Sequence, residues 1–286
     1  MQTVRSILVY LETVQLHDVA LRRAMAIAKS TQANLHLLVC DRAHDQSLAL
    51  NFLQEQLRGE GFSVTAEQAW RGNLHDTIIY VQQVFGCELL VKHHLPESPL
   101  RRALLTPLDW KLLRDCPSAV LMVKTERPWT GGAVLAAVDV DNSDSEHRSL
   151  HTLIVDHGYD LARLAGGALH VIAAHPGPMV APPGLELPPD DAVEARYRQQ
   201  CQRFQAEFCI DDRHLHVMQG AADVLIPDMA RQLDAVVTVI GTVARRGIPG
   251  ALIGNTAEVV LDQLECDVLV LKTHEIIDHL SEMAPD

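Results

Sequence analysis

Residues 236–258 read VVTVIGTVARRGIPGALIGNTAE, and this stretch decides the fold. Its β-branched run ends at Gly241, a glycine-rich basic segment follows, and apolar residues at helical spacing resume after Gly254. The pattern predicts a strand, a loop and a helix. Glycines let the backbone approach an anion closely, and the free N–H groups that open a helix donate to it. We therefore expect a phosphate-binding loop.

Three side chains of this stretch suit a phosphate. Thr256 can add a hydroxyl, and Arg245 or Arg246 can add a charge-assisted hydrogen bond. The alternative for the arginines is that they only solvate a loop of an acidic protein. The spacing is not a Walker A loop, because no Gly-Lys-Ser/Thr closes it, and it differs from the GxGxxG of a dinucleotide fold. A phosphate site here is therefore of another type.

The composition favours an α/β protein. The chain has 286 residues, of which 48% are hydrophobic and only 4% aromatic. A core of Leu, Val, Ala and Ile is typical of buried parallel strands, and the length slightly favours two domains over one.

Charge and cysteine usage narrow the partners and the compartment. The net charge of −13 repels nucleic acid and anionic membranes, so we expect no nucleic-acid partner. The six cysteines form no CxxC pair, which is typical of a reducing compartment. No apolar run is long enough for a membrane span, and the first residues lead directly into a strand. We therefore expect a soluble, cytoplasmic protein.

The chain contains an internal repeat. Residues 6–12 (SILVYLE) match residues 133–139 (AVLAAVD), and each is an apolar strand that ends in a carboxylate. Residues 33–39 (ANLHLLV) match residues 167–173 (GALHVIA). The correspondence continues through the fourth strands (88–92 and 236–240), the loops after them, and the last strands that follow Cys116 and Cys266. Each half is therefore expected to fold alike.

Strand and helix alternate five times in each half. This order predicts an α/β fold with two tandem, doubly wound, parallel five-stranded sheets, over residues 1–127 and 131–286. The short join between them favours close packing as an intramolecular pseudo-dimer. Ligands of such sheets bind at the carboxyl ends of the strands, where the strand order reverses. The proline-rich insertion at 175–189 leaves that end of the second sheet, either as a lid or as a surface excursion.

The loop has the spacing of a known family. Gly241, two residues, Ala244, nine residues and Gly254-Asn255-Thr256 resemble the G-x2-G-x9-G-[ST] loop of the universal stress protein family. Ala244 replaces the second glycine, and Asn255 stands where a small hydroxyl residue is usual. With residues 85–94 and 106–118 of the first half, the whole chain resembles the tandem, E-type members of that family in bacteria.

The resemblance implies a Rossmann-like fold of the HUP type and a role in the stress response, with ATP, alone or with Mg²⁺, as a regulatory ligand of the C-terminal domain. In family members that bind ATP, an acid after the first strand meets the adenosine, and a buried carboxylate can accept from a hydroxyl or an amine. The backbone after the second strand meets the base, and the loop wraps the ribose and phosphates. The corresponding residues here are Asp139, Ile172, Ala173, Gly241, Ala244, Gly254, Asn255 and Thr256.

The first half departs from this pattern. His93 aligns with Gly241, and Thr106 aligns with Gly254. Pro107, which follows, has no N–H to donate to a phosphate. We expect a degenerate phosphate loop in this half, and a pocket that takes something apolar beside Leu104, Leu105 and Trp110.

His93 and His94 raise the question of a metal. With Glu12 or His36 brought close by the fold they would suit zinc, which needs three or four converging ligands. No HxxxH or CxxC supports that hypothesis, and satisfied loop histidines are the alternative, so we expect no metal site.

The sequence favours a binding protein over an enzyme. No residues supply the general base, nucleophile or metal pair of an efficient hydrolase, so any ATP hydrolysis should be slow and incidental. The alternative function is a nucleotide-independent scaffold, or a binder of an apolar or phosphorylated metabolite, that acts through protein contacts. A homodimer is also compatible with the sequence.

Overall fold

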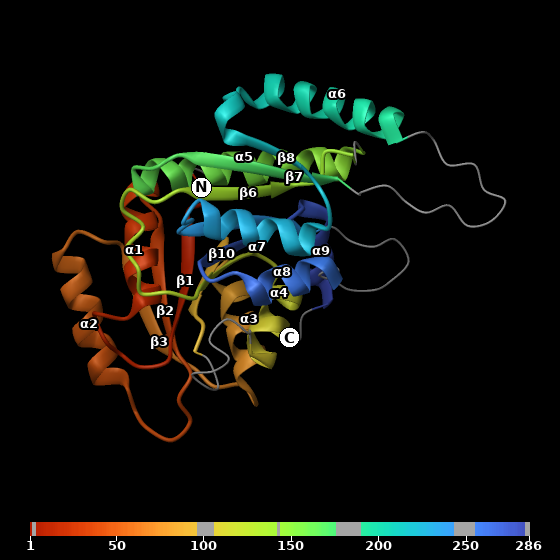
Figure 1. Cartoon of the computed structure of the whole chain (residues 1–286). Coiled ribbons are helices and arrows are strands. Elements are labelled where there is room, and N and C mark those ends of the chain that lie inside the picture. The colour runs from red at the N-terminus through yellow and green to blue at the C-terminus, as the bar shows by residue number, and fades with distance from the viewer. Residues whose placement is uncertain (2–3, 96–105, 142–143, 176–189, 243–254, 284–286) are drawn as a thin grey trace.

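The computed structural model describes residues 1, 4–95, 106–141, 144–175, 190–242 and 255–283, and strands and helices alternate through both halves (Figure 1). The elements of the first half are β1 (Ser6–Leu11), α1 (Val19–Thr31), β2 (Asn34–Val39), α2 (Ser47–Gly59), β3 (Val64–Gln68), α3 (Leu74–Val84), β4 (Leu89–His93), α4 (Pro107–Asp115) and β5 (Ala119–Val123).

The second half repeats this order with one added 3-10 turn and a final helix. Its elements are β6 (Val134–Val138), α5 (Ser145–Ala165), β7 (Leu169–His175), α6 (Asp190–Phe208), η2 (Asp212–His214), β8 (Leu215–Gln219), α7 (Ala222–Gln232), β9 (Val237–Thr242), α8 (Asn255–Gln263), β10 (Asp267–Lys272) and α9 (His274–Met283).

All strands lie in a single sheet with the order β3-β2-β1-β4-β5-β10-β9-β6-β7-β8. Neighbouring strands are parallel within each half, and β5 and β10 pair antiparallel, with Leu121 opposite Leu269. The predicted α/β fold is confirmed, and the two predicted five-stranded sheets join edge to edge. This pairing satisfies the backbone groups that β5 and β10 would otherwise leave open at two sheet edges.

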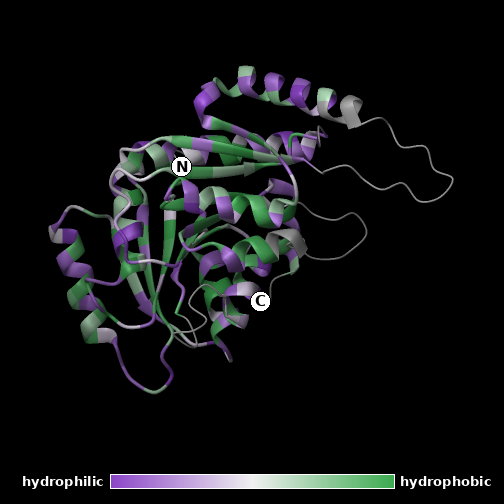
Figure 2. Ribbon diagram, viewed as in Figure 1, coloured by the Kyte–Doolittle hydropathy of each residue, from purple (hydrophilic) through white to green (hydrophobic). Residues whose placement is uncertain are grey.

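Helices cover both faces of the sheet. Alternate residues of β1 show why: Ile7 and Val9 face the core under α1, whereas Leu8 and Tyr10 face the core under α3 and α4. The first core continues under α2, α5 and α6, and the second continues under α7 and α8. Figure 2 shows the hydrophobic residues concentrated in the strands between these helix layers.

The helices begin at residues that satisfy their free N–H groups. Three helices, α1, α3 and α5, are capped by the side chains of Asp18, Asn73 and Asp144. Each side chain accepts a hydrogen bond from the backbone N–H of the residue three positions later. Helix α5 ends at Gly166, whose φ of +67° is left-handed. These caps are encoded in the local sequence, and they fix where each of these helices begins or ends.

Asp267 ties the two halves and their join together. Its carboxylate is fully buried and accepts from Arg23 Nε at 2.8 Å and from Trp129 Nε1 at 2.8 Å. The backbone N–H groups of Lys124 and Thr125 donate to its other oxygen at 2.9 and 3.1 Å. One carboxylate of β10 therefore fixes both the linker and a helix of the first half. Within the described ranges, no helix is both long and apolar enough to cross a bilayer.

Candidate functional site

The carboxyl ends of β6, β7 and β9 bring three of the predicted site residues to one edge of the sheet. Strand β6 lies between the other two, with Val138 opposite Ala173 of β7 and Ala137 opposite Ile240 of β9. Asp139 and Gly241 directly follow residues of these pairs. The strand order reverses at β6 and β9, which is the position where parallel α/β sheets bind ligands.

Asp139 is exposed, not buried as the resemblance suggests. Its Oδ1 accepts from the backbone N–H of Asp141 at 3.2 Å. Beneath it lies the buried His151 of α5, whose ring meets the ring of Phe204 edge-on at 5.6 Å. Burial lowers the pKa of His151, and the nearby charge of Asp139 opposes this only in part. The carboxylate at the end of β6 is therefore exposed to solvent, and the buried imidazole below it has a lowered pKa.

Ile172 and Ala173 lie inside the paired part of β7, since this strand continues to His175. Both residues are buried, and Ala173 has partners on both sides, Val138 and Val217. The strand extends further than the repeat suggests because β8 pairs with it through to His175. The backbone of Ile172 and Ala173 therefore lies between two neighbouring strands, β6 and β8.

Gly241 has a packing role that the motif does not reveal. A Cβ on Gly241 would lie 2.5 Å from Leu150 Cδ2, so the glycine allows α5 to approach β9 closely. The residue itself is half-buried. A need for glycine at this position is thus explained without any ligand.

The remaining predicted residues follow β9. Ala244, Arg245 and Gly254 lie outside the described residues. Helix α8 begins at Asn255 and includes Thr256, as the sequence predicts. The predicted strand and helix are therefore confirmed, while the segment between them lies outside the described residues.

Helix α6 adds residues at this edge that the sequence did not indicate. Arg196 pairs with Asp141 at 2.8 Å, and the Tyr197 hydroxyl donates to the Ala174 carbonyl at 3.0 Å. The Tyr197 ring lies 5.0 Å from the ring of His175. Burial raises the pKa of Tyr197, so its hydroxyl keeps its proton. The only sequence signal in α6 is the helical spacing of its apolar residues. This spacing predicts a helix but gives no indication of a function.

The corresponding edge of the first half contains a buried ion network. Asp109 of α4 is fully buried, and its Oδ1 accepts from Lys92 Nζ at 2.7 Å. Its Oδ2 lies 2.7 Å from His94 Nδ1 and accepts from the Thr106 N–H at 2.9 Å. Burial alone would raise the pKa of Asp109, but His94 and Lys92 hold it below its ordinary value. The protein's own carboxylate therefore lies at the start of this helix, while residues 96–105 of the preceding loop lie outside the described residues.

The hypothetical zinc ligands are separated in the fold. His94 is directed to Asp109, while His36 lies 2.7 Å from Thr65 Oγ1 and 3.1 Å from Glu67 Oε1 on β3. In the described part of the chain, no group of three His, Cys, Asp or Glu residues is arranged to hold a metal ion. His94 and His36 therefore have hydrogen-bonding partners within the protein, on different elements.

The first half does have a cavity at this edge, but its character differs from the expectation. The cavity measures about 210 Å³ and is lined largely by polar side chains, among them Glu12, Asp18, His93 and Glu126. Leu104 and Leu105 lie outside the described residues, and Trp110 does not line it. The sequence of the segment after β4, taken alone, predicts an apolar pocket. The β1–α1 loop and the linker supply the polar walls.

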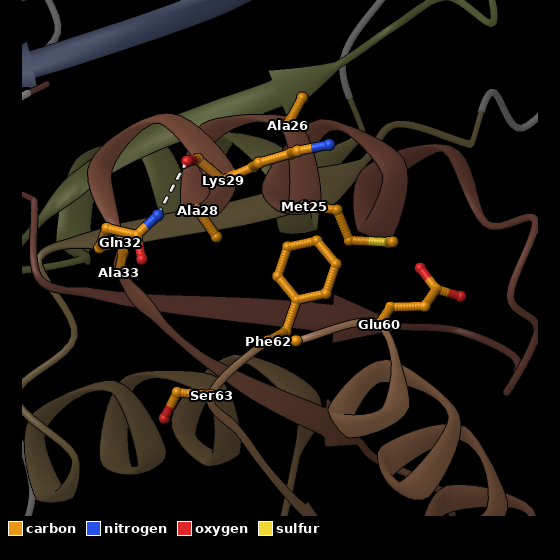
Figure 3. A pocket seen from close by; sticks show the side chains of 10 residues that line it. Met25, Ala26, Ala28, Lys29, Gln32, Ala33, Glu60, Phe62 and Ser63 are labelled. Carbon is orange, nitrogen blue, oxygen red and sulfur yellow. Dashed lines mark hydrogen bonds between the residues drawn. The ribbon is translucent and has the colours of Figure 1, made fainter.

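A larger hollow of about 510 Å³ lies at the opposite end of the sheet (Figure 3). Phe62 forms its floor against Met25 and Ala28, and the rim contains the exposed Lys29 and Glu60. These residues precede β2 and β3, so the hollow faces the amino ends of the strands. It is therefore remote from the edge where α/β sheets bind ligands.

Comparison with known proteins identifies the family. The profile of the universal stress protein family matches residues 133–272. Universal stress protein E of Salmonella typhi is 34% identical over 225 residues, which cover 75% of this chain and 70% of that protein. The universal stress protein E homolog of Haemophilus influenzae is 26% identical over 266 residues, 91% of this chain and 85% of the relative.

A solved structure extends the likeness over the whole chain. A Pseudomonas aeruginosa UCBPP-PA14 protein assigned to the universal stress proteins superposes with a TM-score of 0.91 at 59% identity, covering 99% of this chain and 98% of the other. The repeated α/β halves define a tandem Rossmann-like protein. The chain belongs to the universal stress protein family, and it is similar to the E-type members. Membership supports a function in the stress response.

Proposed function

We propose that the second half binds ATP, with Mg²⁺, as a regulatory ligand of this stress-response protein. The observation that carries the proposal is a contrast between α4 and α8, the helices that follow the fourth strand of each half. The two helices differ in the residues at their N-terminal ends. In the first half Lys92 and Asp109 form an internal ion pair there, at 2.7 Å. The sequence places Ile240 and Ala257 at the matching positions, so no such pair competes with a bound phosphate.

The described residues give this site suitable chemistry. The first N–H groups of an α-helix have no partner within the helix, and the positive end of the helix dipole favours an anion, so the start of α8 suits a phosphate. The exposed Asp139 at the end of β6 is available to accept from a ribose hydroxyl. A triphosphate lying between these two groups satisfies both, and Mg²⁺ offsets part of its charge.

We propose binding without efficient turnover. His151, the imidazole beneath Asp139, is buried, and burial lowers its pKa. The Tyr197 hydroxyl is engaged by the Ala174 carbonyl. His151 packs against Phe204 and Tyr197 is hydrogen-bonded within the protein, which fits a regulatory ligand better than a substrate. The six free cysteines further support a cytoplasmic, reducing environment.

Acid extraction of the purified protein, followed by chromatography, tests whether adenine nucleotide is bound. Mg-ATP should also raise the unfolding temperature, since a ligand at 100 times its Kd adds about 2.7 kcal/mol to the free energy of unfolding. Gly254→Val should abolish both effects and leave the circular dichroism spectrum unchanged, because it puts bulk where a phosphate approaches. Glu12→Ala is the matched control at the same edge of the first half, and it should bind Mg-ATP normally.

One observation favours the second candidate, a scaffold that acts through protein contacts without nucleotide. Gly241 is explained by its close contact with Leu150, so part of the family motif is needed for packing alone. A nucleotide-free extract, together with an unfolding temperature that Mg-ATP does not change, would support the scaffold and contradict ATP binding.

A further inference from the structure

A lysine follows the last strand of each half at the same position of the repeat. Residues 120–125 (VLMVKT) match residues 268–273 (VLVLKT), so Lys124 and Lys272 are equivalent. Because β5 and β10 pair antiparallel, each lysine lies beside the other half. Lys272 is buried, and its Nζ donates to the Ser118 carbonyl at 3.1 Å, in the turn between α4 and β5. The second half thus gives an ammonium group to the backbone of the first.

Lys124 makes the reverse contact, with the C-terminal end of α8. Its Nζ donates to the Leu261 carbonyl at 2.9 Å and also to the Leu264 carbonyl. Helix α8 ends at Gln263, and the carbonyls of the last turn of a helix have no partner within that helix. A side chain of the first half therefore completes the end of a helix in the second half.

The protein holds Lys124 at its backbone as well as at its ammonium group. The backbone N–H donates to Oδ1 of the fully buried Asp267 at 2.9 Å. Burial lowers the pKa of Lys124 to about 8. The groups that oppose this shift are the nearby thiol and carboxylates of Cys266, Asp262, Asp109 and Glu265. The side chain is therefore an ammonium at neutral pH, and it loses its proton in mild alkali.

Helix α8 is short enough to depend on such contacts. Its nine residues span about 14 Å, and an isolated helix of this length is marginal in water. Leu261 and Leu264 are fully buried, so the core fixes the same end that Lys124 contacts. A cation at the C-terminal end also offsets the negative end of the helix dipole. The positive end, at Asn255, is then opposed less by the far end of the same helix.

We propose that Lys124 is a positioning residue for the nucleotide site of the second half. This inference rests on the proposed function, which assigns the start of α8 to the phosphates. Lys124 acts through α8 and does not touch the ligand, because it contacts the opposite end of the helix. The first half therefore contributes to binding in the second half, although Asp109 lies at the start of its own helix.

Titration calorimetry of the full chain with Mg-ATP tests this role. Lys124→Met removes the ammonium group, keeps an apolar side chain, and should bind about tenfold more weakly, which corresponds to about 1.4 kcal/mol. Lys124→Arg keeps a positive charge and N–H donors and should restore most of the affinity. Leu57→Ala is the control for lost stability, because it opens a cavity in the core on the other face of the sheet. It should bind as the unmodified chain does.

The pH dependence of binding separates positioning from stability alone. The ammonium of Lys124 is lost as the pH rises through about 8, so the affinity of the unmodified chain should fall between about pH 7 and pH 9. Lys124→Arg should lack this fall, since a guanidinium stays charged throughout this range. If Lys124→Met does not fold, this comparison still decides, because an equal fall in Lys124→Arg would overturn the proposal.

Failure of this inference differs from failure of the proposed function. An unmodified chain that binds no Mg-ATP would overturn nucleotide binding, and the role of Lys124 with it. Binding that Lys124→Met leaves unchanged, or that Lys124→Met and Leu57→Ala weaken equally, would overturn only the role of Lys124.

Discussion

In the first half the helix that follows the fourth strand starts against the buried carboxylate of Asp109, whereas the second half has Ala257 at the matching position. The carboxylates that follow the first strand of each half, Glu12 and Asp139, are both exposed. Lys92, His94 and Asp109 neutralise one another inside the first half. One topology therefore gives two different sites. The repeat shows that one topology can place a buried negative charge at the start of this helix in one copy and leave the matching position apolar in the other.

The largest effect is expected where the two halves are tied together. Asp267→Asn leaves one carbonyl oxygen for the donors Arg23, Trp129, Lys124 and Thr125, and it places an amide N–H against them. Breaking a buried charged network costs about 3–5 kcal/mol. Urea denaturation should show this loss and test whether the halves then unfold separately.

Asp234→Asn is the control for this comparison. Asp234 also holds the linker, through Arg127, but both side chains are exposed, so the cost should be below about 1 kcal/mol. Equal losses in the two variants would contradict the role assigned to Asp267.

The second prediction concerns the internal ion network of the first half. Asp109→Asn leaves Lys92 and His94 without a carboxylate in a buried site and should lower the free energy of unfolding by about 3 kcal/mol. Asp115→Asn, at an exposed position on the same helix, should cost far less.

The pH dependence of Asp109→Asn gives a sharper test. The pKa of Asp109 is held below its ordinary value in the folded chain, so the carboxylate stabilises the fold above its unfolded pKa of about 3.9. This stability is lost as the pH falls from there through the folded pKa. The variant should lack that part of the acid slope, and parallel slopes would show that the network contributes nothing.

The third prediction separates packing from binding at Gly241. Gly241→Ala forces a Cβ to within 2.5 Å of Leu150 and should cost about 2 kcal/mol through overpacking. Combining it with Leu150→Ala should cost less than the sum of the single changes, since the second change makes room for the first. Gly59→Ala is the control, because a Cβ there meets nothing within 4 Å. Additive losses would show that Gly241 does not act through Leu150.

The fold was largely predictable because its signals are local. Periodicity and capping lie within single elements, and the internal repeat checks each of them twice. The antiparallel pairing of β5 with β10 was not predicted, since it depends on two edges that are distant in sequence.

The site was less predictable because its contacts join residues that are distant in the sequence. Asp109 and His94 are 15 residues apart, and nothing in either local stretch predicts their pairing. Glu126 reaches the first-half cavity from the linker, whose sequence indicates only a chain break. Gly241 matches the motif, but the structure explains this glycine by the close approach of Leu150. The motif gives no information on that contact.

The smallest effect is expected at a pair of matching histidines. His36 on β2 lies between Thr65 and Glu67, whereas His170 on β7 lies 3.0 Å from His216 Nε2 and has His214 at a ring distance of 4.6 Å. Burial lowers the pKa of His170 and of His216, and the neighbouring imidazoles add to the effect. The second half therefore lacks the carboxylate that partly offsets burial at His36.

The sign of the pH effect follows from these shifts. A histidine whose folded pKa is lowered stabilises the fold while both states are neutral, and this stability is lost as the pH falls through the unfolded value of about 6.5. His216→Glu gives the second half the carboxylate of the first and should reduce the loss between about pH 7 and pH 5.5, by less than about 1 kcal/mol because these rings are partly exposed. The exposed His279→Gln is the control, and thermal unfolding measured across this range compares the two. A loss in His216→Glu as large as in the unmodified chain would show that the imidazole cluster does not cause it, and would place the acid sensitivity elsewhere in the protein.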